Sequence, residues 1–251
     1  KNYLLIFLFY KMPEYLIASY FIFFLVLFKN SSFFIKKFDY FYYKIFLIIL
    51  IVIFPNFLLI ISPYPIYDNL RLFLYIIPYL SIIPAIFIFY LFDNLNLKIN
   101  KILITFVLVL FFYSVYNFFL LTPYQYTYLN TFSGKFSESH RKFESDYWGT
   151  SMKQLIKKAN LKKNILSNIA ICGMAKHRVK YYLKKFGFKN IDVVSIHENY
   201  DYIIMTNRVF WQKNTDDLKD LKTCYDQFPG KTISSVKRKG LALSLIRSRE
   251  I

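Results

Sequence analysis

Apolar residues dominate the first half of the chain and gather in long runs. The four runs are Met12–Phe28, Ile45–Ile61, Leu72–Phe92 and Ile102–Leu121. Each holds about 17–21 residues, which is enough for a helix to cross a hydrocarbon core of about 30 Å. We therefore predict a transmembrane α-helical bundle of about four spans over residues 1–121. The stretch Asn2–Tyr10 is too short to span, and we interpret it as an interfacial helix or the end of another span.

The pattern changes after Leu121, where shorter apolar stretches alternate with polar ones. Helical spacing occurs in Ser151–Leu161, Ala175–Phe186 and Thr215–Tyr225. Short apolar runs typical of strands are Ile169–Cys172, Ile191–Ser195 and Tyr202–Met205, with a closing hairpin of Thr232–Lys237 and Leu241–Ile246 around Gly240. Mixed periods of this kind predict a small α/β domain over residues 151–251. Residues 122–150 form the segment that joins it to the last span.

The distribution of lysine predicts the orientation of the spans. The connections Lys29–Lys44 and Asp93–Lys101 are rich in lysine, whereas Ser62–Arg71 carries one Arg and one Asp. Lysine-rich short loops stay in the cytoplasm. Alternation then predicts that Ser62–Arg71 and everything after Leu121 are extracytoplasmic, because long domains cross the membrane largely regardless of charge.

Composition agrees with a membrane protein that carries a basic tail. Apolar residues make up 56% of the chain, above the roughly 45–50% of soluble domains. The tail from Thr122 onward has a net charge of +13, with 24 of the 33 basic and 11 of the 15 acidic residues. Because its lysines are scattered among acidic residues, we expect no nucleic-acid partner.

Cysteine and histidine give little sign of metal chemistry. Cys172 lies in an apolar, strand-like run, and a buried free thiol is expected there. The alternative, a disulfide with Cys224, requires an oxidising compartment. His140, His177 and His197 are isolated in the sequence, so we expect no metal site.

The segment after the last span is dense in aromatic and polar side chains. Its candidate binding residues are Tyr124, Gln125, Asn130, Glu144, Asp146 and Trp148. Aromatic rings, amides and carboxylates at a bilayer surface suit a polar, ring-shaped substrate such as a sugar. Paired carboxylates could also serve acid–base chemistry on a sugar. The alternatives are acids that anchor lysines or cap the helix at Ser151, and aromatic anchors of the membrane interface.

A second group of candidates lies in the predicted outer loop before the third span. Asp68 and Arg71 are three residues apart at a predicted helix start and share a face, beside Tyr67. Arg71 could hold a lipid phosphate through its planar guanidinium. The alternative is a helix-capping Asp and an Arg that reaches to the interface.

Taken together, these segments resemble a family of bacterial membrane glycosyltransferases of the GT-C type, similar to protein O-mannosyltransferases and the lipid A aminoarabinose transferase. The stretch from Tyr67 to Arg71 resembles the family's "YDGxRH" motif, with Asn69 in place of Gly and Leu72 where His is common. Lys11 and Pro13 resemble its "KxP" entry to a span. The residues from Pro123 to Ser151, including Tyr128, Gly134 and Tyr147-Trp148-Gly149, resemble a second motif.

The resemblance implies transfer of a sugar from a polyprenyl-phosphate donor to a glycan, lipid or protein acceptor outside the bacterial inner membrane. It implies that Asp68 and Arg71 line the donor site, whereas Tyr124, Gln125 and Asn130 shape the acceptor side or dock the tail. The family's catalytic base lies in a first outer loop, so we expect this chain to be a C-terminal part and name no catalytic residue. We expect no cofactor beyond the lipid-linked sugar.

Two other classes of function fit parts of the sequence. A non-enzymatic membrane anchor that presents an extracytoplasmic binding domain would also account for the spans and the basic tail. A transporter is disfavoured because no span carries a well-buried charge pair, and Glu14 lies at a span's end.

Overall fold

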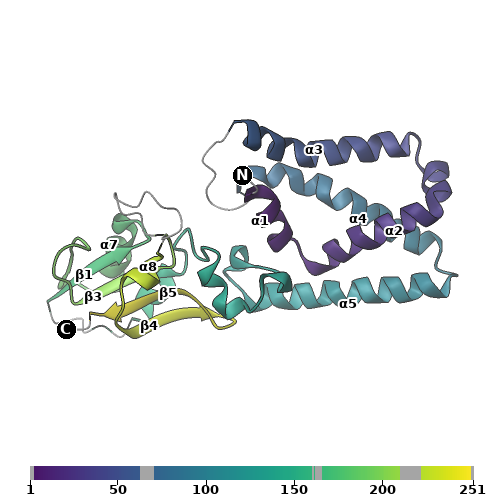
Figure 1. The fold of residues 1–251 in the computed structure, drawn as a ribbon. Helices are drawn as coiled ribbons and strands as arrows, with labels where there is room; N and C mark the ends of the chain where they lie inside the picture. The colour runs from purple at the N-terminus through teal and green to yellow at the C-terminus, as the bar shows by residue number, and fades with distance from the viewer. Residues whose placement is uncertain (1–2, 63–70, 160, 162–165, 210–221, 250–251) are drawn as a thin grey trace. The chain divides into compact units, whose positions relative to one another are not determined.

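The chain folds into two compact units, which we describe separately. A computed structural model describes residues 3–62, 71–159, 161, 166–209 and 222–249 (Figure 1). Unit 1 comprises Lys1–Phe119 and Tyr128–Ser133, and unit 2 comprises Leu120–Thr127 and Gly134–Ile251. The boundary therefore falls inside the segment that follows the last predicted span.

Unit 1 is a bundle of long apolar helices. Its elements are α1 (Tyr3–Lys11), α2 (Glu14–Lys37), α3 (Phe41–Ile61), η1 (Arg71–Ile76), α4 (Ile77–Asp93) and α5 (Lys98–Leu120). Four helical stretches are long and apolar enough to cross a membrane, namely Glu14–Lys37, Phe41–Ile61, Leu72–Asp93 and Lys98–Leu120. These correspond to the four predicted spans and confirm a helical bundle followed by an α/β domain.

The first span is longer than predicted because a kink, and not a loop, follows Phe28. Asn30 has non-helical backbone angles (φ −131°, ψ 42°), but the chain resumes its helix up to Lys37. The Asn30 side chain donates a hydrogen bond of 2.6 Å to the Tyr90 hydroxyl. Beyond the kink, Phe34 is fully buried and stacks on Phe41. The hydropathy pattern shows only the polar residues at the kink. It contains no information about the packing that continues the helix beyond them.

The bundle core is aromatic, and much of its outer surface is apolar. Phe23, Phe34, Phe87 and Leu91 are completely buried between α2, α3, α4 and α5. Many large apolar side chains point outward instead, and Phe28 is 86% exposed. A soluble protein rarely exposes contiguous apolar surface of this extent, whereas a bilayer solvates it.

Unit 2 is built on a five-stranded mixed sheet with the order β2-β1-β3-β5-β4. The strands are β1 (Ser167–Cys172), β2 (Ile191–Val193), β3 (Tyr202–Thr206), β4 (Lys231–Arg238) and β5 (Leu241–Ser248). β1 pairs in parallel with β2 and β3, and β5 pairs antiparallel with β3 and β4. The predicted strands and hairpin are all present, with β2 ending two residues before the predicted Ser195.

Residues on alternate sides of β1 form the two cores of unit 2. Ile169 and Ile171 pack against α6 (Met152–Lys157) and α7 (Lys176–Lys185), whereas Ala170 and Cys172 face α8 (Cys224–Gln227). Successive strand side chains point to opposite faces, so one short strand contributes to both cores. The predicted helix Thr215–Tyr225 lies mostly outside the described residues, which contain only its end as the start of α8.

The expectation of a free thiol at Cys172 is wrong, because Cys172 is bonded to Cys224. The two Cα atoms are 5.9 Å apart, although 52 residues separate them in sequence. Cys172 is the last residue of β1 and Cys224 is the first of α8, so the fold brings both to the carboxyl end of β1. The structure thus shows the alternative considered from the sequence, in which Cys172 pairs with Cys224.

Candidate functional site

The predicted site residues separate into those that hold the structure together and those that line a pocket. Tyr67 and Asp68 lie outside the described residues. Arg71 is the first residue of η1, and the structure describes its backbone but not its side chain. The remaining six candidates belong to the segment after the last span.

Asn130 fastens this segment to α1 within unit 1. Its side-chain amide donates to the carbonyls of Phe9 (2.6 Å) and Met12 (3.0 Å), and its backbone N–H donates to Tyr10 (2.9 Å). Carbonyls at a helix C-terminus have no partner inside the helix, and Asn130 supplies one. The Asn130 Oδ1 atom is buried without a hydrogen-bond partner.

Glu14 makes a second connection of the same kind in unit 1. Its carboxylate accepts hydrogen bonds from the Tyr128 hydroxyl (2.8 Å), the Thr131 N–H (2.8 Å) and the Ser114 hydroxyl (3.2 Å). Glu14 is buried, so these three donors compensate for the loss of water around its charge. The sequence marked Glu14 only as an acid at the start of a span, and its partners more than 90 residues away could not be seen.

Asp146 is the corresponding buried carboxylate in unit 2. It is completely inaccessible to solvent and accepts hydrogen bonds from the N–H groups of Thr150 and Ser151, both at 2.9 Å. The hydroxyls of Ser151 and Tyr126 also donate to it. A carboxylate that accepts from these two backbone N–H groups holds the turn that leads into α6. Its hydrogen-bonding capacity is therefore committed to the turn 146–151.

Glu144 has different partners from Asp146. One Glu144 oxygen accepts from the Val209 N–H (2.9 Å), and the other lies 3.9 Å from Arg208 Nε. Between the two acids, Ser145 donates to the side chain of Asn207. Glu144 thus anchors the segment to the chain after β3, whereas Asp146 anchors it to α6. Gln125 donates to the Thr122 hydroxyl (2.9 Å).

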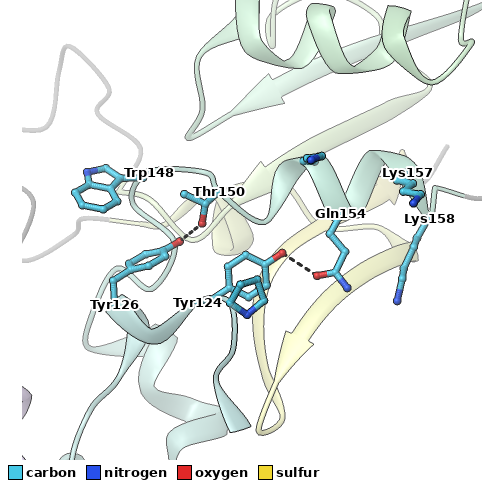
Figure 2. A pocket seen from close by; sticks show the side chains of 9 residues that line it. Tyr124, Tyr126, Trp148, Thr150, Gln154, Lys157 and Lys158 are labelled. Carbon is cyan, nitrogen blue, oxygen red and sulfur yellow. Dashed lines mark hydrogen bonds between the residues drawn. The ribbon is translucent and has the colours of Figure 1, made fainter. Parts of the chain in front are cut away.

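A pocket of about 670 Å³ opens on unit 2 beside these structural residues (Figure 2). Its lining residues are Pro123, Tyr124, Tyr126, Trp148, Thr150, Lys153, Gln154, Lys157 and Lys158. Pro123 follows the last residue of α5 by three positions, so chain length keeps this wall within about 10 Å of the end of the last span. Of the predicted candidates, Tyr124 and Trp148 line the pocket together.

Aromatic rings form one end of the pocket. The Tyr126 and Trp148 rings have centroids 5.4 Å apart at an interplanar angle of 33°. The Tyr126 hydroxyl is held by Asp146 and by Thr150 Oγ1 (2.6 Å), which fixes the ring. Burial first, and then the nearby Asp146 charge, raise the pKa of Tyr126 far above its usual value. The ring is therefore a neutral phenol at physiological pH.

Tyr124 forms the floor between the aromatic and basic ends. Its hydroxyl donates to Gln154 Oε1 (2.7 Å), and the Arg238 guanidinium lies 4.9 Å from its ring centroid. Arg238 also donates to Gln154 Oε1 (3.3 Å) and to the Thr122 carbonyl (3.0 Å). Burial raises the pKa of Tyr124 as well. This network orients the Gln154 amide toward the pocket wall.

Three lysines also line the pocket, and Lys157 and Lys158 lie at the end opposite the aromatic rings. Lys153 and Lys157 are four residues apart on α6, so they lie on one face of the helix, and Lys158 follows its last residue. All three are exposed, and no described carboxylate lies within ion-pair distance of their ammonium groups. Sequence analysis missed them, although their spacing on a predicted helix was a usable signal. No acidic residue lines this pocket among the described ones.

The described residues contain no group of three or more His, Cys, Asp or Glu side chains that could hold a metal ion. The residues that line the pocket supply aromatic faces, an amide, three hydroxyls and three ammonium groups. Comparison of the chain with protein-family models, with curated proteins and with solved structures gave no significant match.

Proposed function

We propose that this chain is the C-terminal part of an integral membrane glycosyltransferase that moves a sugar from a polyprenyl-phosphate donor to an extracytoplasmic acceptor. The observation that carries the proposal is the Tyr126–Trp148 platform, which begins just after the last span. Aromatic faces held at fixed angles bind the apolar C–H face of a sugar ring. Because these side chains are already fixed, binding costs little conformational entropy. The few residues of chain between the end of α5 and Pro123 suit a substrate anchored in lipid.

Two features support an extracytoplasmic location for unit 2 at a bacterial inner membrane. The Cys172–Cys224 bond persists in oxidising compartments and is rare in the cytosol. In unit 1, Lys37 forms an ion pair of 3.1 Å with Asp93, so the lysine-rich end of α2 lies beside the end of α4, which precedes the lysines at the start of α5. Lysine-rich ends favour the cytoplasm. α5 starts beside this end and runs 23 residues, or about 34 Å, to the other side.

In this proposal the reaction breaks the bond between the sugar's anomeric carbon and the phosphate oxygen, and forms a bond to an acceptor hydroxyl. The hydroxyl proton goes to a base, for which we name no residue of this chain. Following the family resemblance, Arg71 contacts the departing phosphate and stabilises its negative charge, with Asp68 and Tyr67 beside it. Tyr126 and Trp148 hold the saccharide.

The transfer of radiolabel from a panel of polyprenyl-phosphate hexoses, in membranes that contain the full-length protein, tests the proposal. Trp148→Ala is expected to lower transfer at least about fivefold, taking for the lost ring the cost of about 1–3 kcal/mol that holds for a base stacked on an aromatic side chain. Tyr181→Ala is the matched control, because Tyr181 is an exposed aromatic on α7 that does not line the pocket. Equal transfer by both variants would refute a role for the pocket.

A non-enzymatic anchor that presents a binding domain is the second candidate. It is favoured by the use of both Glu144 and Asp146 in hydrogen bonds that hold the fold. Under this alternative the pocket binds a saccharide, but no member of the donor panel yields transferred label. If the full-length protein binds a saccharide but transfers none, the anchor proposal holds and the enzyme proposal is wrong.

A further inference from the structure

We infer that the pocket of unit 2 selects an anionic saccharide, with the sugar ring on Tyr126 and Trp148 and a phosphate or carboxylate on Lys153, Lys157 and Lys158. The inference rests on the proposed saccharide site and adds a charge requirement to it. Sugar binding alone needs stacking faces and hydroxyl partners. It does not need three cations on one wall.

The aromatic end and the basic end of the pocket suit a ligand with a ring at one end and a negative charge at the other. In Figure 2, Trp148 and Tyr126 lie at one end of the pocket, and Lys157 and Lys158 lie at the other, with Tyr124 and Gln154 between them. A ring on the aromatic end therefore places a charged substituent toward the lysines. A volume of about 670 Å³ is that of a site for a ligand of one or two sugar rings.

The electrostatics of the wall favour an anion and disfavour a cation. Three exposed ammonium groups without an ion-pair partner repel one another, and a bound anion relieves that repulsion. Asp146 is buried behind Tyr126 and Thr150, and its single negative charge is outnumbered by the three lysines that line the pocket. Arg238 adds a further positive charge near Tyr124.

The test uses tryptophan fluorescence of the whole chain reconstituted in lipid nanodiscs. The chain has two tryptophans, so Trp211→Phe leaves Trp148 as the only reporter. Ligand pairs of a neutral hexose and its 1-phosphate are titrated for glucose, mannose and N-acetylglucosamine, with inorganic phosphate alone as a further probe. A farnesyl-phosphate hexose distinguishes a lipid-linked source of the charge from a soluble one.

At least one 1-phosphate is expected to bind tenfold or more tightly than its neutral parent, and more weakly as salt rises. The triple variant Lys153→Gln, Lys157→Gln and Lys158→Gln should remove that difference, since each exposed lysine accounts for roughly a threefold change. The matched control removes the same charge from α7 through Lys176→Gln, Lys180→Gln and Lys184→Gln, and it should bind as the parent does.

The outcomes separate this inference from the proposed function. Neutral and phosphorylated sugars that bind equally, with no effect of the pocket lysines, would overturn the charge requirement and leave the saccharide site intact. Inorganic phosphate that binds as tightly as the sugar phosphates would overturn the saccharide part. The absence of a fluorescence response to every probe would overturn both.

Discussion

The two units bury one carboxylate each in the same way, but they differ in how they treat apolar surface. Glu14 in unit 1 and Asp146 in unit 2 are both enclosed by hydroxyl and backbone N–H donors. Unit 1, however, exposes many large apolar side chains, whereas unit 2 buries its own on both faces of a sheet and adds a disulfide. One unit is suited to lipid and the other to water.

The difference indicates where function can reside. In a membrane, the outward face of a helix bundle is occupied by lipid, and polar groups are kept for internal contacts. Unit 2 can leave polar and charged groups free on its surface, as it does with Lys153, Lys157 and Lys158. The comparison predicts that unit 2 is destabilised by changes that leave unit 1 inserted.

The largest effect is expected from Asp146→Ala. Removal of this carboxylate leaves several buried donors without an acceptor, and each costs about 1–3 kcal/mol. Unit 2 should lose at least about 3 kcal/mol of unfolding free energy, which raises its unfolded population more than about 100-fold. Limited proteolysis of the membrane-embedded protein should then release unit 2 and leave the helices of unit 1 protected.

The control for this change is Glu138→Ala. Glu138 is exposed and lies 3.8 Å from Lys135 in a surface ion pair, which contributes little. If Asp146→Ala were as resistant to protease as Glu138→Ala, the role of Asp146 in holding the turn 146–151 would be wrong.

The next effect is that of the disulfide. Replacement of Cys172 and Cys224 by Ala should lower the stability of unit 2 by about 2–4 kcal/mol, because the unfolded chain loses a constraint across 52 residues. Thermal unfolding of the full chain, followed by protease sensitivity of unit 2, measures this. A reductant should reproduce the loss in the wild type and have no effect on the double variant, whereas a wild type indifferent to reductant would argue against the bond.

Glu14→Gln tests the equivalent carboxylate of unit 1 and should have a smaller effect. The amide offers a single acceptor oxygen to three donors. We therefore expect the free energy of local opening of residues 128–133 to fall by about 1–2 kcal/mol. Hydrogen exchange of the Thr131 N–H would report it as a roughly tenfold faster rate. Thr105→Ala, on the exposed side of α5, is the control that should leave this rate unchanged.

The smallest expected effect is a dependence on alkaline pH. The folded pKa of Tyr126 is raised by burial and by Asp146, so the unfolded chain releases this proton first as pH increases. The stability of unit 2 is thus complete below about pH 10, the usual pKa of tyrosine, and falls above it. Tyr126→Phe should flatten that fall, and an unchanged slope between pH 9 and 11.5 would contradict the assignment.

Much of the fold could be predicted from the sequence because it follows from local pattern. The four spans follow from uninterrupted apolar runs, and β1, β3 and the β4–β5 hairpin follow from short apolar stretches between turns. The kink at Asn30 could not be predicted, and the Cys172–Cys224 bond was only the alternative to a free thiol, because each depends on a partner distant in sequence. Hydropathy and periodicity contain no information about such partners.

The candidate site was predictable only in part for the same reason. Aromatic density after the last span pointed to Tyr124 and Trp148, which do line the pocket. Asp146 and Asn130 have the residue types of a binding site, yet their hydrogen bonds are made to the protein itself. Whether a polar side chain faces a ligand or a neighbour is decided by tertiary contacts, so residue type alone does not separate them.

The most direct test of the central claim is chemical labelling of Lys158→Cys in sealed membrane vesicles of known sidedness. The chain has only two cysteines, and both are in the disulfide, so the new thiol is the one that reacts. We predict that a membrane-impermeant maleimide labels it from the extracytoplasmic face, and that saturating polyprenyl-phosphate hexose slows the labelling. Labelling only from the cytoplasmic face, or at a rate that no member of the hexose panel changes, would contradict an outward-facing saccharide pocket.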